Sequence, residues 1–107
     1  MTFPKRWNEA TYYDNEGGRS YNMNVERMDA HGGWIGSTVD LARFLVHFDG
    51  FNSKPDLISK STFDIMTTPS NVNQRKAKGW NVNQRNNVLK NAWHTGSLPG
   101  TGAIVVR

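Results

Sequence analysis

Residues 93–102 concentrate side chains that can transfer protons or donate hydrogen bonds. The segment reads Trp-His-Thr-Gly-Ser-Leu-Pro-Gly-Thr-Gly and contains His94, Thr95 and Ser97 together with three glycines. An imidazole has a pKa of about 6.5, so it can exchange a proton near neutral pH. Glycines let a ligand approach the backbone closely because they carry no side chain. The segment therefore predicts either a mobile surface loop or the rim of an active site.

A helix is expected upstream of this segment, over residues 37–48. Ser37 is a favourable N-cap, and Asp40 lies three residues later, as in a capping box. Four apolar residues recur with the spacing of one helical face: Leu41, Ala42, Leu45 and Phe48. Gly50 is expected to end the helix. A second, shorter helix is expected to begin at Ser59 or Ser61 and to stop before Pro69.

The C-terminal third of the chain predicts three strands. Residues 79–83 alternate apolar and polar side chains, and Asn86-Asn87 is a turn signal. Residues 88–95 would form the return strand, and residues 103–106 a third. The predicted fold class is α+β, with two short helices followed by an antiparallel β-meander.

The chain divides into an irregular lead-in, residues 1–30, and an incomplete domain, residues 31–107. An apolar strand reaches to one residue before the end of the sequence, which would leave a sheet edge uncovered. We therefore expect a fragment that lacks the upstream half of its domain. Self-association through the edge at residues 103–107 would be one way of covering that edge.

Three segments, residues 32–45, 79–82 and 94–100, resemble in this order the C-terminal part of the serine β-lactamase-like family. This bacterial group holds class C β-lactamases, D-alanyl-D-alanine carboxypeptidases and related esterases. The resemblance implies the β-lactamase/transpeptidase-like fold, a peptide or ester substrate and a periplasmic or other extracytoplasmic parent. It implies no cofactor.

The resemblance also implies roles for the histidine segment. His94, Thr95 and Gly96 correspond to the family's third signature, on a strand that lines the active site. The backbone N–H of Ser97 would donate to the oxyanion that forms during acyl transfer. The family often has a cationic lysine where His94 stands, and a free imidazole is mostly uncharged at neutral pH. We therefore expect a parent suited to peptidase or esterase work rather than efficient penicillin hydrolysis.

The nucleophile that the family uses is missing from the sequence. Its signature is Ser-x-x-Lys, and none of the seven serines has a lysine three residues later. The letters of a second signature, Tyr-x-Asn, occur at Tyr13-Asp14-Asn15, but they lie too close to Gly32 for the family spacing, and we interpret the match as chance. This chain alone is therefore predicted to be inactive, with the nucleophile in a missing upstream half.

Two other functions stay open. One is a non-catalytic module that binds a peptidoglycan-like peptide on the same scaffold, which the absence of Ser-x-x-Lys favours. The other is a basic nucleic-acid-binding domain, because the net charge is +4. Its densest basic cluster, Arg75-Lys76-Ala77-Lys78, has no interleaved aromatic residue, so nucleic acid is an unlikely partner.

Several other classes of site lack their sequence signals. There is no cysteine and no H-x-x-x-H spacing, so a metal site is not expected. No apolar run approaches the roughly 20 residues of a membrane span. The five residues 71–75 recur as residues 81–85, both reading Asn-Val-Asn-Gln-Arg. We interpret this repeat as coincidence or, at most, a duplicated loop, since a solenoid needs three or more units.

Overall fold

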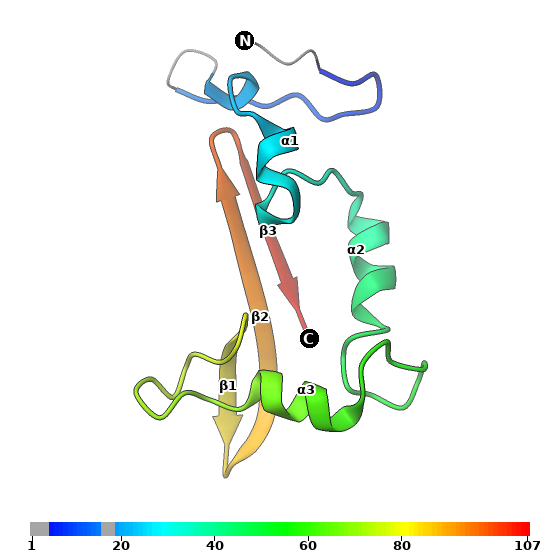
Figure 1. The fold of residues 1–107 in the computed structure, drawn as a ribbon, viewed down its shortest axis with the longest axis vertical. Helices are drawn as coiled ribbons and strands as arrows, with labels where there is room; N and C mark the ends of the chain where they lie inside the picture. The colour runs from blue at the N-terminus through cyan, green and yellow to red at the C-terminus, as the bar shows by residue number, and fades with distance from the viewer. Residues whose placement is uncertain (1–4, 16–18) are drawn as a thin grey trace. The chain divides into compact units, whose positions relative to one another are not determined.

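The computed structural model describes residues 5–15 and 19–107, which fold as two compact units (Figure 1). One unit contains residues 1–36 and 95–103, and the other contains residues 37–94 and 104–107. The described elements, in chain order, are the 3-10 turn Arg19–Tyr21, α1 (Val25–Met28), the 3-10 turn Asp29–His31, α2 (Thr38–Leu45), α3 (Lys60–Thr67), β1 (Asn81–Arg85), β2 (Val88–Leu98) and β3 (Thr101–Val106). The α+β class with an antiparallel sheet is confirmed.

The lead-in is more ordered than its sequence suggested. Its residues 1–4 and 16–18 lie outside the described part, residues 5–15 form no helix or strand, and α1 follows further along. The Asn24 side chain caps α1 by accepting a hydrogen bond from the Arg27 N–H at 2.9 Å. A helix of four residues is too short to produce a periodic apolar pattern, which is why the sequence did not indicate it.

The turn that joins β2 to β3 is held by the lead-in within the first unit. Pro99 and Gly100 form this turn, and Gly100 has a φ of 75°. A Cβ at Gly100 would lie 2.5 Å from the Ser20 Oγ, so the close approach also requires glycine. Buried Ser20 in turn donates from its N–H and its hydroxyl to the Asp14 carboxylate.

The strands form one sheet in the order β1-β2-β3. Asn86 and Asn87 connect β1 to β2 with φ angles of 52° and 59°, as the turn signal predicted. Pairing runs from Arg85 opposite Val88 to Asn81 opposite Trp93. Both β2 and β3 are longer than the sequence indicated, and β1 begins later than residue 79.

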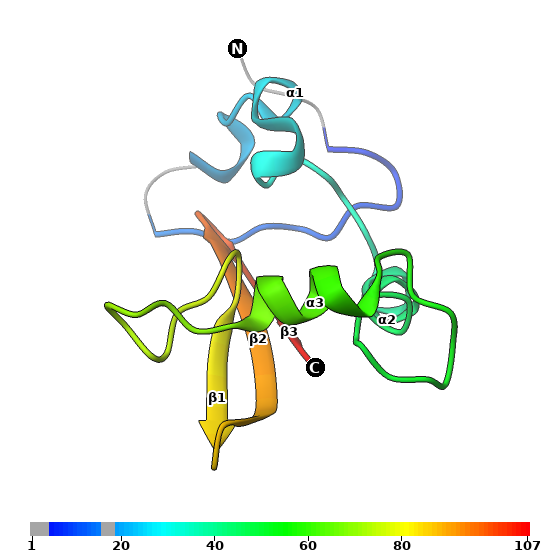
Figure 2. The same cartoon turned by 60° about the horizontal axis from the view of Figure 1, so that its bottom comes forward.

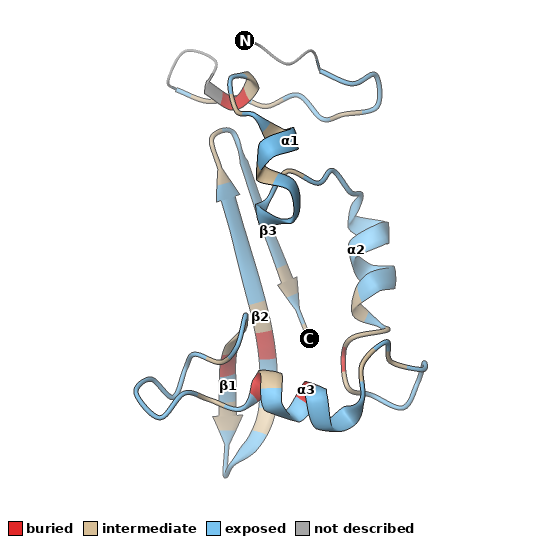
Figure 3. Ribbon diagram, in the orientation of Figure 1, coloured by how far each residue is buried: buried red, intermediate tan, exposed pale blue. Residues whose placement is uncertain are grey.

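A small core lies in the second unit, where α3 crosses the sheet. Phe63 of α3, Val82 of β1 and Ala92 of β2 are the buried hydrophobic residues of the described chain. Val82 and Ala92 are opposite each other in the register. Figure 2 shows α3 lying across β2, and Figure 3 shows buried segments of α3, β1 and β2 in this region. Gly50 packs on the Phe63 ring so closely that a Cβ would lie 2.6 Å from it.

Helix α2 begins as predicted and ends earlier. Ser37 and Asp40 form the expected capping box. The helix stops at Leu45 rather than continuing to Phe48. His47 accounts for this correction, because its Nδ1 contacts the Pro55 carbonyl at 2.8 Å and its own carbonyl accepts from the Leu57 N–H, which ties the chain to a loop.

The apolar face of α2 has no described partner, and the helix contains no buried residue. Phe44 is 53 % exposed and stacks on Phe48, with the ring centroids 5.4 Å apart.

The sequence left open whether Ser59 or Ser61 begins the second helix. Ser59 is the N-cap of α3, and its side chain accepts a hydrogen bond from the Thr62 N–H.

Candidate functional site

The histidine segment forms the last third of β2 and is exposed. The sequence predicted a strand ending at residue 95, but β2 continues to Leu98 and includes all four candidate residues. The four residues are exposed: His94, Thr95, Gly96 and Ser97. They are therefore consecutive strand residues, and the prediction of a mobile loop at this place is wrong.

The orientation of the β2 backbone follows from Gly96. A Cβ placed on Gly96 would lie 3.9 Å from the Cβ of Ala103, so these residues face each other across β2 and β3. The Gly96 carbonyl oxygen lies 4.0 Å from the position of a Cβ on Gly102, so it points toward β3. Backbone groups alternate in direction along a strand. The N–H and C=O groups of Thr95 and Ser97 therefore point away from β3.

The second unit shows the same alternation independently. Ala92 is an even-numbered residue like Gly96. It forms two backbone hydrogen bonds, at 3.0 and 2.8 Å, with Arg107, which follows β3. Trp93 instead pairs with Asn81 of β1, on the opposite side. Odd-numbered residues of this part of β2 thus direct their backbone groups to the side on which β1 lies.

No strand of the described residues pairs with residues 94–98 on the side away from β3. The β1 register ends at the pair Asn81–Trp93, and no strand in residues 5–15 or 19–107 continues it beside residues 94–98. The N–H groups of Thr95 and Ser97 are consequently directed at an unpaired sheet edge. This is the geometry that a backbone oxyanion donor requires, because the donor must not be used within the fold.

The candidate side chains do not all share one face. Successive strand residues project to opposite faces of a sheet, so His94 and Thr95 diverge. No described residue donates to or accepts from the His94 imidazole. What the four residues have in common is the sheet edge, and the backbone of Thr95 and Ser97 is the part of the segment that faces it.

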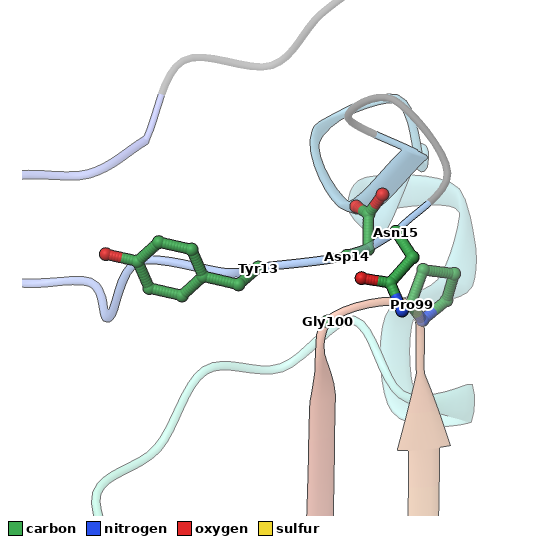
Figure 4. A pocket seen from close by; sticks show the side chains of 5 residues that line it. All are labelled: Tyr13, Asp14, Asn15, Pro99 and Gly100. Carbon is green, nitrogen blue, oxygen red and sulfur yellow. The ribbon is translucent and has the colours of Figure 1, made fainter.

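A hollow of about 340 Å³ lies beside the turn that follows this segment, within the first unit. Figure 4 shows its lining side chains: Tyr13, Asp14, Asn15, Pro99 and Gly100. Asn15 lies next to Pro99, whereas the Tyr13 ring points away and is 83 % exposed. The Tyr-x-Asn letters therefore occur at this turn, but the Tyr13 hydroxyl and the Asn15 amide are not directed at a common point.

Two surveys of residues 5–15 and 19–107 bear on other classes of site. No group of three or more His, Asp or Glu side chains could hold a metal ion there. No helix in those ranges is long and apolar enough to cross a membrane.

Comparisons with known proteins found no matching family model, no matching curated protein and no matching solved structure. The three resembling segments and the strand geometry therefore carry the functional argument by themselves. The sequence singled out these four residues as candidates, and all four lie in β2. It missed the backbone alternation that distinguishes Thr95 and Ser97, since this depends on the pairing with β3.

Proposed function

We propose that residues 94–97 form the substrate-binding edge of a penicillin-recognising serine hydrolase with the β-lactamase/transpeptidase-like fold. The parent would be a D,D-peptidase, a β-lactamase-like protein or an esterase acting outside the cytoplasm. The nucleophile would come from residues outside these 107, because no Ser-x-x-Lys occurs among them. The observation that carries the proposal is the Ser97 N–H, which is directed at an unpaired edge of β2.

In this proposal the strand supplies electrostatic stabilisation and not the attacking group. Attack on an ester or peptide carbonyl places negative charge on its oxygen, and a fixed N–H donor stabilises that charge. Ser97 would provide this donor. Gly96 would let the substrate lie flat against the edge, because a side chain there would add bulk beside the reacting group. His94 would bind the substrate or exchange a proton with it.

A binding experiment on the chain itself tests the edge. We expect N-acetyl-D-alanyl-D-alanine to cause saturable NMR shifts of the backbone amides of Thr95 and Ser97. Ser97→Pro removes the N–H donor without breaking the pairing with β3, and it should abolish these shifts at Thr95. The matched variant Ser97→Ala keeps the donor and should retain them. Unchanged binding by Ser97→Pro would contradict the proposal.

Turnover separates catalysis from binding alone. The 107-residue chain should hydrolyse p-nitrophenyl acetate no faster than buffer. A longer product that also contains a Ser-x-x-Lys segment should hydrolyse it, with a loss of about 100-fold or more on His94→Ala if the imidazole acts in proton transfer. Binding of the dipeptide with no turnover by the longer product would favour the non-catalytic peptide-binding module, our second candidate.

The nucleic-acid alternative is weakened by the contacts of its basic cluster. The Lys76 ammonium donates to the Asn81 side-chain oxygen, and the Lys78 ammonium donates to the Ile65 carbonyl at 3.1 Å. The first bond lies within residues 76–81, and the second joins this segment to α3. A site that follows the phosphates of a nucleic acid needs several cations that have no other partner. In this cluster Arg75 is the cation without a described side-chain partner.

A further inference from the structure

The two copies of Asn-Val-Asn-Gln-Arg lie side by side within the second unit. The Val82 N–H of the second copy donates to the Arg75 carbonyl of the first at 3.0 Å. Lys76 and Asn81 form an isolated antiparallel bridge next to this bond. The repeat therefore places two segments of identical sequence next to each other. Our interpretation of the repeat as coincidence did not predict this.

An open hollow of about 340 Å³ lies beside the paired copies and the turn that follows the second copy. Its lining consists of one cation, one apolar residue and five carboxamides: Arg75, Val82, Gln74, Asn83, Gln84, Asn86 and Asn87. Val82 is buried and belongs to the core, so it anchors this wall of the hollow. Both backbone groups of Arg75 form hydrogen bonds. Its carbonyl accepts from the Val82 N–H, and its N–H donates to the Asn73 side chain at 2.9 Å.

The sequence around the lining residues carries only positive side-chain charges. Asp64 is the last acidic residue of the sequence, and residues 65–107 contain six Lys and Arg but no Asp or Glu. Arg75 has no ion-pair partner among the described residues. A guanidinium without an ion-pair partner can bind an anionic ligand, and its planar fork matches the two oxygens of a carboxylate.

The carboxamides narrow the class of ligand. Asn and Gln side chains both donate and accept hydrogen bonds, so they suit hydroxyl groups, which also do both. A phosphate or sulfate offers acceptors alone and would leave the carboxamide oxygens opposed to its own. We propose that this hollow binds a small polyhydroxylated carboxylate, of the sugar-acid class, with its carboxylate on Arg75. Its hydroxyls would bind Asn86, Asn87 and one of Asn83 and Gln84, because these two consecutive strand residues project to opposite faces of β1.

This site is independent of the proposed hydrolase function. It is built from β1, its turn and the preceding loop, whereas the proposed substrate edge is built from residues 94–97. A failure of either proposal leaves the other standing.

The experiment is an NMR titration of the full chain with D-glucuronate. We expect saturable shifts of the side-chain amide groups of Asn86 and Asn87 and of one of Asn83 and Gln84. D-glucose lacks the carboxylate and hexanoate lacks the hydroxyls, so each should bind at least about tenfold more weakly. The absence of saturable shifts with glucuronate would overturn the proposal.

Two matched variants locate the charge that matters. Arg75→Gln and Arg85→Gln make the same change in the same local sequence, but Arg85 does not line the hollow. Arg75→Gln should weaken glucuronate binding about tenfold or more, and Arg85→Gln by less than about twofold. Equal losses would indicate diffuse attraction to positive charge and would overturn the site.

A third variant guards against an indirect effect of the arginine change. Asn87→Asp keeps the size of the side chain, and aspartate tolerates the φ of 59° at this position. Its negative charge repels the carboxylate, so it should weaken glucuronate binding more than it weakens glucose binding. Inorganic phosphate or a short oligonucleotide that bound as tightly as glucuronate would instead identify a phosphate-binding face and refute the sugar-acid assignment.

Discussion

The guanidinium carbon of Arg107 lies 4.1 Å from the centroid of the Phe51 ring. The same group is 5.1 Å from the centroid of the Phe63 ring, and its Nε donates to the Asp49 carbonyl. Arg107 thereby links the end of the β3 segment to the core residue Phe63 and to the loop that follows α2. A half-buried arginine thus packs against the core of the second unit.

We expect Arg107→Ala to lower the free energy of unfolding by about 1–2 kcal/mol, through loss of the ring contacts and the hydrogen bond. Urea denaturation followed by tryptophan fluorescence would measure this. Arg85→Ala is the matched control, since Arg85 is exposed and has no described side-chain partner, and it should change the value by less than about 0.5 kcal/mol. Equal effects of the two substitutions would show that the ring contacts do not contribute.

The β2–β3 turn should tolerate no side chain at Gly100. Gly100→Ala places a Cβ 2.5 Å from the Ser20 Oγ and also imposes a φ of 75° on an alanine, so we expect a loss of about 2 kcal/mol or more. Gly36→Ala is the control, because nothing lies within 4 Å of the added Cβ there. A similar urea midpoint for the two variants would contradict the described packing of the turn.

The backbone alternation along β2 predicts a pattern of hydrogen exchange. The amides of Ala92 and Gly96 point toward β3 and should exchange slowly, whereas those of Thr95 and Ser97 face the open edge and should exchange fast. NMR-detected exchange in D2O measures each amide separately. Comparable protection of Ser97 and Gly96 would mean that the edge is covered and would remove the support for the proposed oxyanion donor.

Helix α2 should lose its first turn in acid. Hydrogen bonds from the Ser37 hydroxyl and the Ser37 N–H lower the pKa of Asp40 from its ordinary value of 3.8. A lowered pKa means that the carboxylate stabilises the folded cap above the unfolded pKa, and that this stability is lost as the pH falls through the folded pKa. Amide shifts of residues 38–41 should therefore stay constant above about pH 5 and change only in acid.

Ser37→Ala provides the control for that titration. It removes the main hydrogen bond to Asp40 and should bring the midpoint of the Asp40 titration up toward 3.8. It should also weaken the helix by about 1 kcal/mol through loss of the N-cap. A midpoint that did not move would show that the capping box is not formed in solution.

The outer side of β3 should promote self-association. In the described chain, β3 is an edge strand, and Ile104 and Val106 are 63 % and 51 % exposed. We expect sedimentation to show concentration-dependent association that Ile104→Lys reduces, because a lysine on an edge strand opposes pairing with a second copy. Leu57→Lys, in an exposed loop, adds the same charge away from the edge and should have little effect.

Local signals predicted most of the elements correctly. Ser37, Asp40 and Ser59 begin their helices because capping depends on residues within one turn, and Asn86-Asn87 forms the turn that its letters indicate. The end of α2 could not be predicted in this way. It depends on the contact of His47 with the loop at Pro55, which no periodicity records.

The candidate residues were chosen from the sequence, but the geometry of the strand that contains them could not be predicted from it. The histidine, hydroxyl and glycine types at 94–97 are visible in the sequence. Their directions are not, because the direction of each amide depends on which residues of β3 and β1 lie opposite. The hollow at Arg75 was invisible for the same reason, since it forms only when the two copies of the repeat lie next to each other.

The register of β1 with β2 shifts between Asn83 and Gln84, which pair with Asn91 and Leu89 and leave Lys90 without a partner. Deletion of Lys90 from β2 would therefore keep every later pair of the β1–β2 register. A one-residue deletion between Trp93 and Leu98 would instead turn each remaining side chain to the opposite face. Changes in strand length during divergence should therefore accumulate at the bulge, and the stretch that holds the proposed substrate edge should keep a constant length.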